Sequence, residues 1–249
     1  MAQLVTSPRF VFILGMHRSG TSCLAGSLER CGLFLGPVSR SNRHNFKGNH
    51  EIRSVVALNQ HILKANGGDW SFPPVNIALS WQYKLAIRVV VAWLSTRKPR
   101  GLKDPRLLLL LEAWLEAMPS FTLVGTFRHP AAVAKSLARR NQLSGEQAYQ
   151  LWLRYNTELM RWHKQYGFPL IEFNLADVEA YRQTIINLAK RLGLRPDTTQ
   201  LNEFITPALD HYPASTEPMP ARCQAVYVYL RQHRYGVNRS ADSKQPFIF

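Results

Sequence analysis

Residues 9–31 read RFVFILGMHRSGTSCLAGSLERC. The apolar run predicts a short buried strand over Arg9–Gly15, and apolar residues at helical spacing predict a helix over Gly20–Cys31. A short loop with a glycine at each end joins the two. Backbone N–H groups in such a loop, together with the N-terminus of the helix, attract an anion. This part of the chain therefore predicts a phosphate-binding loop.

The loop differs from the Walker loop that binds ATP and GTP. A Walker loop has a Lys after its second glycine, where the side chain reaches the β- and γ-phosphates. This chain has Thr21 at that position, and its basic residue is Arg18, inside the loop. The forked guanidinium suits the oxygens of an anion smaller than a triphosphate. The alternative interpretation is a tight strand-to-helix turn that binds nothing.

The rest of the chain alternates between extended and helical patterns. Buried strands are predicted over Phe121–Phe127 and Pro169–Phe173, with a short extended piece over Gly101–Pro105. Strands separated by helices favour a single α/β domain over residues 1–249, in which helices flank both faces of a central parallel sheet. Ligands of such folds bind at the carboxyl ends of the strands. Helices are predicted over Ile52–Leu63, Leu79–Leu94, Leu107–Met118, Pro130 to about Arg140, Gly145–Tyr166, Asp177–Leu192 and Met219–Gln232, and loops over Asn42–Glu51 and Gly67–Pro74.

A second anion site is predicted at the end of the strand Phe121–Phe127. Arg128 ends this strand, Pro130 suits the first position of the next helix, and Ser136 lies within that helix. An Arg at the carboxyl end of a strand and a hydroxyl near the start of the next helix can share one phosphate. The alternative is that Arg128 pairs with a carboxylate and Ser136 is a buried helix hydroxyl.

The composition limits the class of function. The 249 residues are 46% apolar and 19% charged, which suffices for a buried core and excludes wholesale disorder. The net charge of +15 favours an anionic partner, and nucleic acid, an anionic membrane surface, a nucleotide and an acidic polymer all qualify. The Lys and Arg residues are scattered and form no basic helix with interleaved aromatics, so specific nucleic-acid binding is not expected.

The cysteines and the apolar runs favour a reducing, cytoplasmic setting. Cys23, Cys31 and Cys223 form neither a CxxC pair nor an even framework, which argues against a disulfide scaffold and a cysteine zinc site. The apolar run at residues 10–14 is too short for the core of a signal peptide. No run approaches the roughly 18 apolar residues of a membrane span, so no transmembrane segment is expected. No pattern specifies an oligomeric state.

The two anion sites together resemble the nucleotide site of sulfotransferases that use 3′-phosphoadenosine 5′-phosphosulfate (PAPS). In that superfamily the phosphosulfate loop has a basic residue where Arg18 stands, followed by a Ser-Gly-Thr-Thr/Ser sequence, which here is residues 19–22. The superfamily binds the 3′-phosphate with an Arg and a Ser that match Arg128 and Ser136. Residues 45–51 (NFKGNHE) and 103–106 (KDPR) are similar to a bacterial-type branch, although Asn49-His50 replaces an aromatic pair. The resemblance covers about residues 9–166.

This resemblance implies a P-loop NTPase-like sulfotransferase fold and an activity. The enzyme would transfer the sulfuryl group of PAPS in line to a hydroxyl or amine acceptor and release adenosine 3′,5′-bisphosphate. It would require no metal, and no metal-ligand cluster is visible in the sequence. A carbohydrate, a lipid-linked glycan, a small metabolite and a peptide all remain open as acceptors, and an anionic acceptor would suit the net charge.

The resemblance also implies roles for individual residues. Arg18 would stabilise the leaving phosphate and Glu51 would act as the base, with His50 and then Asp104 as rivals for that role. Lys47 would contact the sulfate or lie solvated, while Lys103 and Arg106 would orient substrate or pair structurally with Asp104. The residues expected to bind the nucleotide are His17, Arg18, Ser19, Gly20, Thr21, Ser22, Arg128 and Ser136.

Two other classes of protein remain alternatives to a sulfotransferase. One is a P-loop kinase-like nucleotide-binding protein, which ATP turnover with magnesium would reveal. The other is a non-catalytic module that binds a nucleotide or nucleic acid, which would retain binding without any group transfer.

Overall fold

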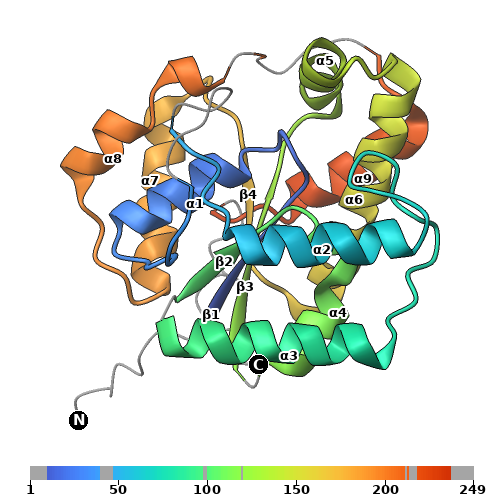
Figure 1. Ribbon diagram of the computed structural model, residues 1–249. Coiled ribbons are helices and arrows are strands. Elements are labelled where there is room, and N and C mark those ends of the chain that lie inside the picture. The colour runs from blue at the N-terminus through green and yellow to red at the C-terminus, as the bar shows by residue number, and fades with distance from the viewer. Residues whose placement is uncertain are drawn as a thin grey trace.

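A computed structural model describes residues 10–39, 47–97, 100–118, 120–210, 212 and 218–236 of the chain. In these residues short strands alternate with helices (Figure 1). The strands are β1 (Phe10–Leu14), β2 (Gly101–Lys103), β3 (Phe121–Phe127) and β4 (Leu170–Glu172). The helices are α1 (Thr21–Arg30), α2 (Arg53–Ala65), α3 (Trp81–Arg97), α4 (Leu107–Ala117), α5 (Pro130–Asn141), α6 (Gly145–Tyr166), α7 (Val178–Arg191), α8 (Thr198–Phe204) and α9 (Ala221–Gln232), with a short 3₁₀ helix η1 (Pro207–Leu209).

The described strands form one parallel sheet in the order β2-β1-β3-β4. β1 lies inside the sheet, where Ile13 pairs with Lys103 on one side and with Val124 on the other. All seven residues of β3 are buried. Such continuous apolar strands are typical of a parallel sheet that is covered on both faces. The expected α/β architecture is confirmed.

The pleat of β1 divides the core into two layers, because successive side chains of a strand point to opposite faces. Val11 and Ile13 pack with α1, α7 and α8 on one face of the sheet. Phe12 and Leu14 pack on the other face, where α2 to α6 and α9 lie. Figure 1 shows these two layers, with α1, α7 and α8 to one side of the strands and α6 and α9 to the other.

The order of the strands places the predicted sites together. The chain leaves β1 through α1, α2 and α3 to reach β2 at one side, and then crosses back through α4 to β3 at the other side. This reversal at β1 is a topological switch point, where the loops that leave neighbouring strands diverge and open a crevice. The loop after β1 and Arg128 after β3 both lie at the carboxyl ends of these adjacent strands.

Some elements differ from the expectation. Gly101–Lys103 is a strand of the sheet, because each of its three residues pairs with a residue of β1. α3 begins at Trp81 and continues to Arg97, three residues beyond the expected end at Leu94. α8 and η1 were not expected; α8 has only seven residues, and its start depends on the side chain of Asp197, which caps it. Of the expected loop over Asn42–Glu51, residues 42–46, including Asn45 and Phe46, lie outside the described residues.

Candidate active site

The loop after β1 has a backbone that only glycine adopts easily at two points. Gly15 and Gly20 have φ angles of 153° and 82°. A Cβ on Gly20 would lie 2.3 Å from the ring of Phe173, and one on Gly15 would lie 2.5 Å from the carbonyl oxygen of Thr126. The two glycines therefore let the loop pass close to the ends of β3 and β4. The helix α1 then begins at Thr21 without a side-chain cap, so no capping side chain satisfies its first N–H groups.

The second predicted anion site is built at the end of β3. The indole N–H of Trp152 donates a hydrogen bond of 3.0 Å to the carbonyl oxygen of Arg128 and fixes the end of the strand. His129 caps the next helix, because its Nδ1 accepts a hydrogen bond from the backbone N–H of Ala131. Pro130 occupies the first helical position, as the sequence predicted. Ser136 is buried within this helix, α5.

The two sites meet. Nε of Arg18 donates a hydrogen bond of 2.8 Å to Oγ of Ser136. Nη1 of Arg128 donates one of 3.3 Å to the carbonyl oxygen of Arg18. Three of the residues expected to bind the nucleotide are therefore in direct contact, although Ser136 follows Arg18 by 118 residues.

Arg128 also has an acidic partner. Its Nη2 donates a hydrogen bond to Oδ1 of Asp210 and another, of 2.7 Å, to the carbonyl oxygen of Tyr212. The side chains of Arg128 and Asp210 are 6% and 7% exposed, so this is a buried ion pair. The alternative interpretation of Arg128, pairing with a carboxylate, therefore describes its contact in this structure, and Ser136 is a buried helix hydroxyl as well.

The cluster carries an excess of positive charge. Burial, with the guanidinium groups of Arg140 and Arg128 nearby, lowers the pKa of Arg18 to about 10. Burial also lowers the pKa of Arg128, although Asp210 opposes that shift. A lowered pKa means that the charged form is disfavoured where it stands. An anion bound between these two guanidinium groups would remove that penalty, so the site suits a phosphate or sulfate group.

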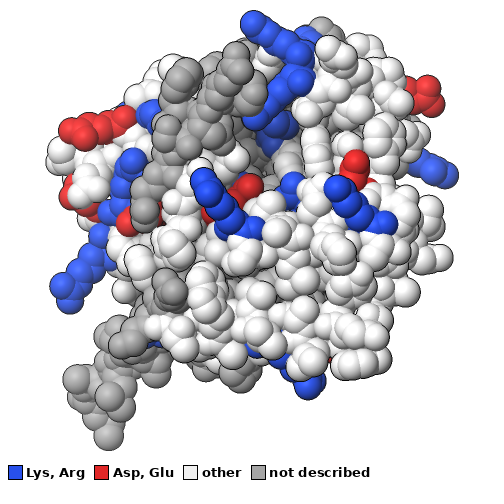
Figure 2. Space-filling model, in the orientation of Figure 1, with Lys and Arg blue, Asp and Glu red and all other residues white. Residues whose placement is uncertain are grey.

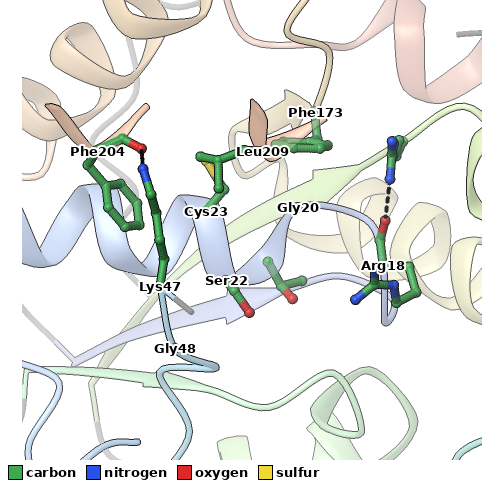
Figure 3. Close-up of a pocket in the computed structure, with 11 residues that line it drawn as sticks. Arg18, Gly20, Ser22, Cys23, Lys47, Gly48, Phe173, Phe204 and Leu209 are labelled. Atoms are coloured by element: carbon green, nitrogen blue, oxygen red, sulfur yellow. Dashed lines mark hydrogen bonds between the residues drawn. The ribbon is translucent and has the colours of Figure 1, made fainter. Parts of the chain in front are cut away.

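A pocket of about 650 Å³, including its open mouth, lies beside this cluster. Figure 3 shows Arg18 and Lys47 at opposite ends of it, with Ser22 and Cys23 of α1 between them. Figure 2 shows Lys and Arg side chains beside a hollow near the top of the face in view. The pocket is lined by Arg18, Gly20, Thr21, Ser22, Cys23, Lys47, Gly48, Arg128, Phe173, Phe204 and Leu209.

Glu51 is paired with Lys103 next to the loop. Nζ of Lys103 lies 2.6 Å from Oε1 of Glu51 and donates further hydrogen bonds to the carbonyl oxygen of Asn49 and to Oγ of Ser22. Lys103 is buried, whereas the side chain of Glu51 is 16% exposed. The pairing of Ile13 with Lys103 in the sheet explains this position, because it places the end of β2 beside the start of the loop. Lys103 therefore joins Glu51, the residue expected to be the base, to Ser22 at the start of α1.

His50 and Lys47 point into a different network. Nε2 of His50 lies 2.8 Å from the carbonyl oxygen of Lys47, and its Nδ1 lies 3.2 Å from Oε2 of Glu29. Lys47 extends to the C-terminal end of α8, where its Nζ donates a hydrogen bond to the carbonyl oxygen of Phe204 (Figure 3). Both ring nitrogens of His50 face protein oxygens, so in this structure the imidazole secures the loop over residues 47–51.

Asp104 lies in the core rather than in the pocket. Its carboxylate accepts hydrogen bonds from Nδ2 of Asn59 and from both the backbone N–H and Nη1 of Arg106. Asn59 in turn accepts a hydrogen bond from the indole N–H of Trp114. The structural ion pair expected as one alternative for the KDPR segment is therefore formed between Asp104 and Arg106. Lys103, by contrast, points to the loop.

His17 is not among the residues that line this pocket. Its ring is tilted against Trp70 at a centroid distance of 4.4 Å and meets the edge of Tyr155 at 6.0 Å. Its Nδ1 is buried and has no hydrogen-bond partner among the described residues. Burial lowers the pKa of His17 well below 6.5, and the cations of Arg106, Lys103, Arg18 and Arg140 lower it further. His17 is therefore a neutral imidazole within a positive site.

Several pocket residues were missed from the sequence. Phe173, Phe204 and Leu209 are apolar residues at the ends of β4, α8 and η1, and nothing in their local pattern separates them from core residues. Asp210 was missed because its partner Arg128 is 82 residues away. Phe173 was predicted as the last residue of the strand Pro169–Phe173, whereas β4 ends at Glu172 and Phe173 lies just beyond it.

No family model matches this sequence, and no curated protein matches it. Solved structures are similar over most of the chain. The sulfotransferase domain of the olefin synthase from Synechococcus PCC 7002 has a TM-score of 0.51 at 18% identity, and the match covers 91% of this chain and 94% of that one. The sulfotransferase STF1 from Mycobacterium tuberculosis H37Rv has a TM-score of 0.43 at 16% identity, with 92% and 78% covered. The match to the olefin synthase domain shows that the chain has the fold of a sulfotransferase domain, and the expected fold is confirmed.

None of the helices in the described residues is long and apolar enough to cross a membrane.

Proposed function

We propose that this chain is a PAPS-dependent sulfotransferase that transfers a sulfuryl group to a hydroxyl or amine acceptor. The observation that carries the proposal is the contact between the two predicted anion sites. Arg18 of the loop touches Ser136, and Arg128 touches the backbone of Arg18, beside one open pocket. A nucleotide with phosphate groups at both its 5′ and 3′ ends would engage both sites at once.

The residues of the site fit such a nucleotide. Gly20 has no side chain where a Cβ would strike Phe173, and the N–H groups at the start of α1 remain uncapped. Oγ of Ser19 is buried without a partner in the part of the chain that the structure describes. Burial lowers the pKa of both Arg18 and Arg128, and among the described residues only Arg128 has a carboxylate partner, Asp210. These features would hold the 5′ end at residues 18–22 and the 3′-phosphate at Arg128 and Ser136.

The chain's own residues have distinct roles in the proposed reaction. PAPS, when bound, supplies an activated sulfuryl group with adenosine 3′,5′-bisphosphate as its leaving group. Arg18 would meet the charge that develops on that leaving phosphate, because it lines the pocket and Ser136 orients its guanidinium there. Glu51 would accept the proton of the acceptor, since it is a partly exposed carboxylate next to the loop. Lys103 would orient Glu51, and His50 would hold the loop that carries it.

A transfer assay tests the proposal. The protein is incubated with labelled PAPS and a panel of saccharides, lipid-linked glycans, small metabolites and peptides. We expect label on at least one class of acceptor, with transfer lost in Arg18→Ala and retained in Arg161→Ala, an exposed arginine on α6. Turnover of ATP with magnesium, together with no transfer from PAPS, would instead support a kinase.

A further inference from the structure

The ion pair between Arg128 and Asp210 fills a position that the proposed function assigns to a phosphate group. Asp210 follows η1 directly, and Leu209 before it lines the pocket. The carboxylate accepts a hydrogen bond from Nη2 of Arg128, which also donates to the carbonyl oxygen of Tyr212. Nη1 of Arg128 contacts the loop backbone, and Nη2 is hydrogen-bonded to Asp210 and Tyr212 of the same chain.

The burial of this pair makes an anionic partner necessary. Both side chains are less than a tenth exposed. Removing one partner of a buried pair leaves an uncompensated charge, which is strongly unfavourable. Arg128 therefore needs an anionic partner whether or not a nucleotide is bound. Without a nucleotide, the carboxylate of Asp210 is that partner.

We infer that Asp210 is an intramolecular competitor for the 3′-phosphate subsite: its carboxylate holds Arg128 in the absence of nucleotide and is displaced by a 3′-phosphate. This inference rests on the proposed function. It adds a residue that sets the affinity for nucleotide, which neither the loop nor the Arg128–Ser136 pattern revealed.

The chemistry of the two anions explains why the exchange is possible. A phosphate carries up to two charges and three acceptor oxygens, whereas Asp210 contacts Arg128 through one oxygen of a single charge. Ser136 accepts from Arg18 and retains its own hydroxyl proton, which a phosphate oxygen could accept. A phosphate would thus gain a partner at Ser136 that Asp210 does not use, which favours its displacement of the carboxylate.

The competition has a predictable effect on affinity. When a subsite is free for only a fraction of the time, the apparent dissociation constant rises by the inverse of that fraction. If Asp210 leaves the subsite free for about one-tenth of the time, nucleotides with a 3′-phosphate bind about tenfold more weakly than they would without it. A nucleotide without a 3′-phosphate does not bind at Arg128, so its dissociation constant does not depend on Asp210.

Calorimetric titrations with two ligands test the inference. Adenosine 3′,5′-bisphosphate and adenosine 5′-monophosphate are titrated into the wild type, Asp210→Asn and Asp177→Asn. Asp177 caps α7 and does not contact Arg128, so it is the matched control. We expect Asp210→Asn to bind the bisphosphate about tenfold more tightly, with the monophosphate and the control variant unchanged. Equal or weaker binding of the bisphosphate by Asp210→Asn would overturn the inference.

Hydrogen exchange of the wild type gives a second test that needs no variant. The backbone N–H groups of Leu209 and Asp210 donate to the carbonyl oxygens of Thr206 and Pro207. We expect their exchange to accelerate with the bisphosphate and to stay unchanged with the monophosphate. Unchanged exchange with the bisphosphate bound would overturn the inference while leaving the proposed function intact. No binding of the bisphosphate to any of the proteins would contradict the proposed function, and the inference with it.

Discussion

Nε of Arg18 lies 2.8 Å from Oγ of Ser136, and this hydrogen bond joins the loop after β1 to the helix after β3. Each residue comes from a local pattern that predicts an anion site by itself. Their contact makes the two patterns parts of one site. The hydrogen bond also holds the guanidinium of Arg18 in a defined direction. The backbone of Arg18 has a positive φ of 67°.

Loss of this hydrogen bond is expected to weaken nucleotide binding without unfolding the protein. In Ser136→Ala, Arg18 loses an acceptor and the proposed 3′-phosphate loses a donor. A hydrogen bond to a charged group contributes about 1.5–3 kcal/mol, so affinity for adenosine 3′,5′-bisphosphate should fall by about 10- to 100-fold. Calorimetry measures this, with Ser95→Ala on α3 as the control serine variant. Unchanged affinity in Ser136→Ala would remove Ser136 from the site.

Glu51→Gln separates chemistry from binding. The amide keeps the shape of the side chain and a hydrogen-bond acceptor for Lys103, but it is a poor proton acceptor. We expect transfer from labelled PAPS to fall by about 10²- to 10⁴-fold while the affinity for adenosine 3′,5′-bisphosphate is retained. If turnover stays at the wild-type rate, the proton acceptor is another group.

Gly20 and Gly167 are two glycines with a positive φ, and alanine substitutions at them separate backbone strain from a steric clash. Both have positive φ, but a Cβ on Gly20 would strike Phe173 at 2.3 Å, whereas nothing lies within 4 Å at Gly167. Gly167→Ala should cost about 1–2 kcal/mol of unfolding free energy from backbone strain alone. Gly20→Ala adds the clash and should cost more, with loss of nucleotide binding. Urea unfolding measures both costs; equal values would mean that the loop adjusts freely around Phe173.

The pKa of His17 predicts a dependence of stability on pH. Burial and neighbouring cations lower this pKa well below 6.5 in the folded protein. Below about pH 6.5 the unfolded chain therefore binds a proton that the folded chain does not, so stability falls as the pH falls. The cations that act on the imidazole are Arg18 in the loop, Lys103 at the end of β2, Arg106 after β2 and Arg140 on α5, and Tyr155 on α6 meets the ring edge to face.

Substitution of His17 isolates its contribution. His17→Asn removes the titrating group, so its unfolding free energy should decrease less than that of the wild type between pH 7.5 and pH 5. Urea unfolding at several pH values gives both slopes. Identical slopes would show that His17 protonates equally in the folded and unfolded states.

The parts of the candidate site whose positions could be predicted depend on local patterns. A strand, a glycine loop and a helix in direct succession predict the loop after β1, and Arg128 was chosen as a candidate because it follows an apolar strand. Asp104 shows the limit of this reasoning, since its KDPR segment allowed both an orienting and a structural role. The choice depends on Asn59, which donates to Asp104 from α2. Such long-range partners depend on how helices pack on the sheet, which a local pattern does not encode.

The same limit applies to Lys103 and Asp210. Lys103 reaches Glu51 and Ser22 because β2 pairs with β1 in a particular register. Asp210 reaches Arg128 because the chain returns past the pocket after α8, a helix too short to be predicted from its pattern. Both contacts bring new chemistry to the site, and both depend on the three-dimensional arrangement.

The central claim is that Arg18, Ser136 and Arg128 form one nucleotide site for a ligand with phosphates at both ends. Calorimetric titration of adenosine 3′,5′-bisphosphate at low salt tests it most directly. We use wild type and the double variant Arg128→Ala/Asp210→Ala, which leaves no unpaired buried charge from this ion pair. The account predicts binding at one site in the wild type and a loss of at least about 100-fold in the double variant, because charged hydrogen bonds of about 1.5–3 kcal/mol each are removed. No binding in the wild type, or equal binding in both proteins, would contradict it.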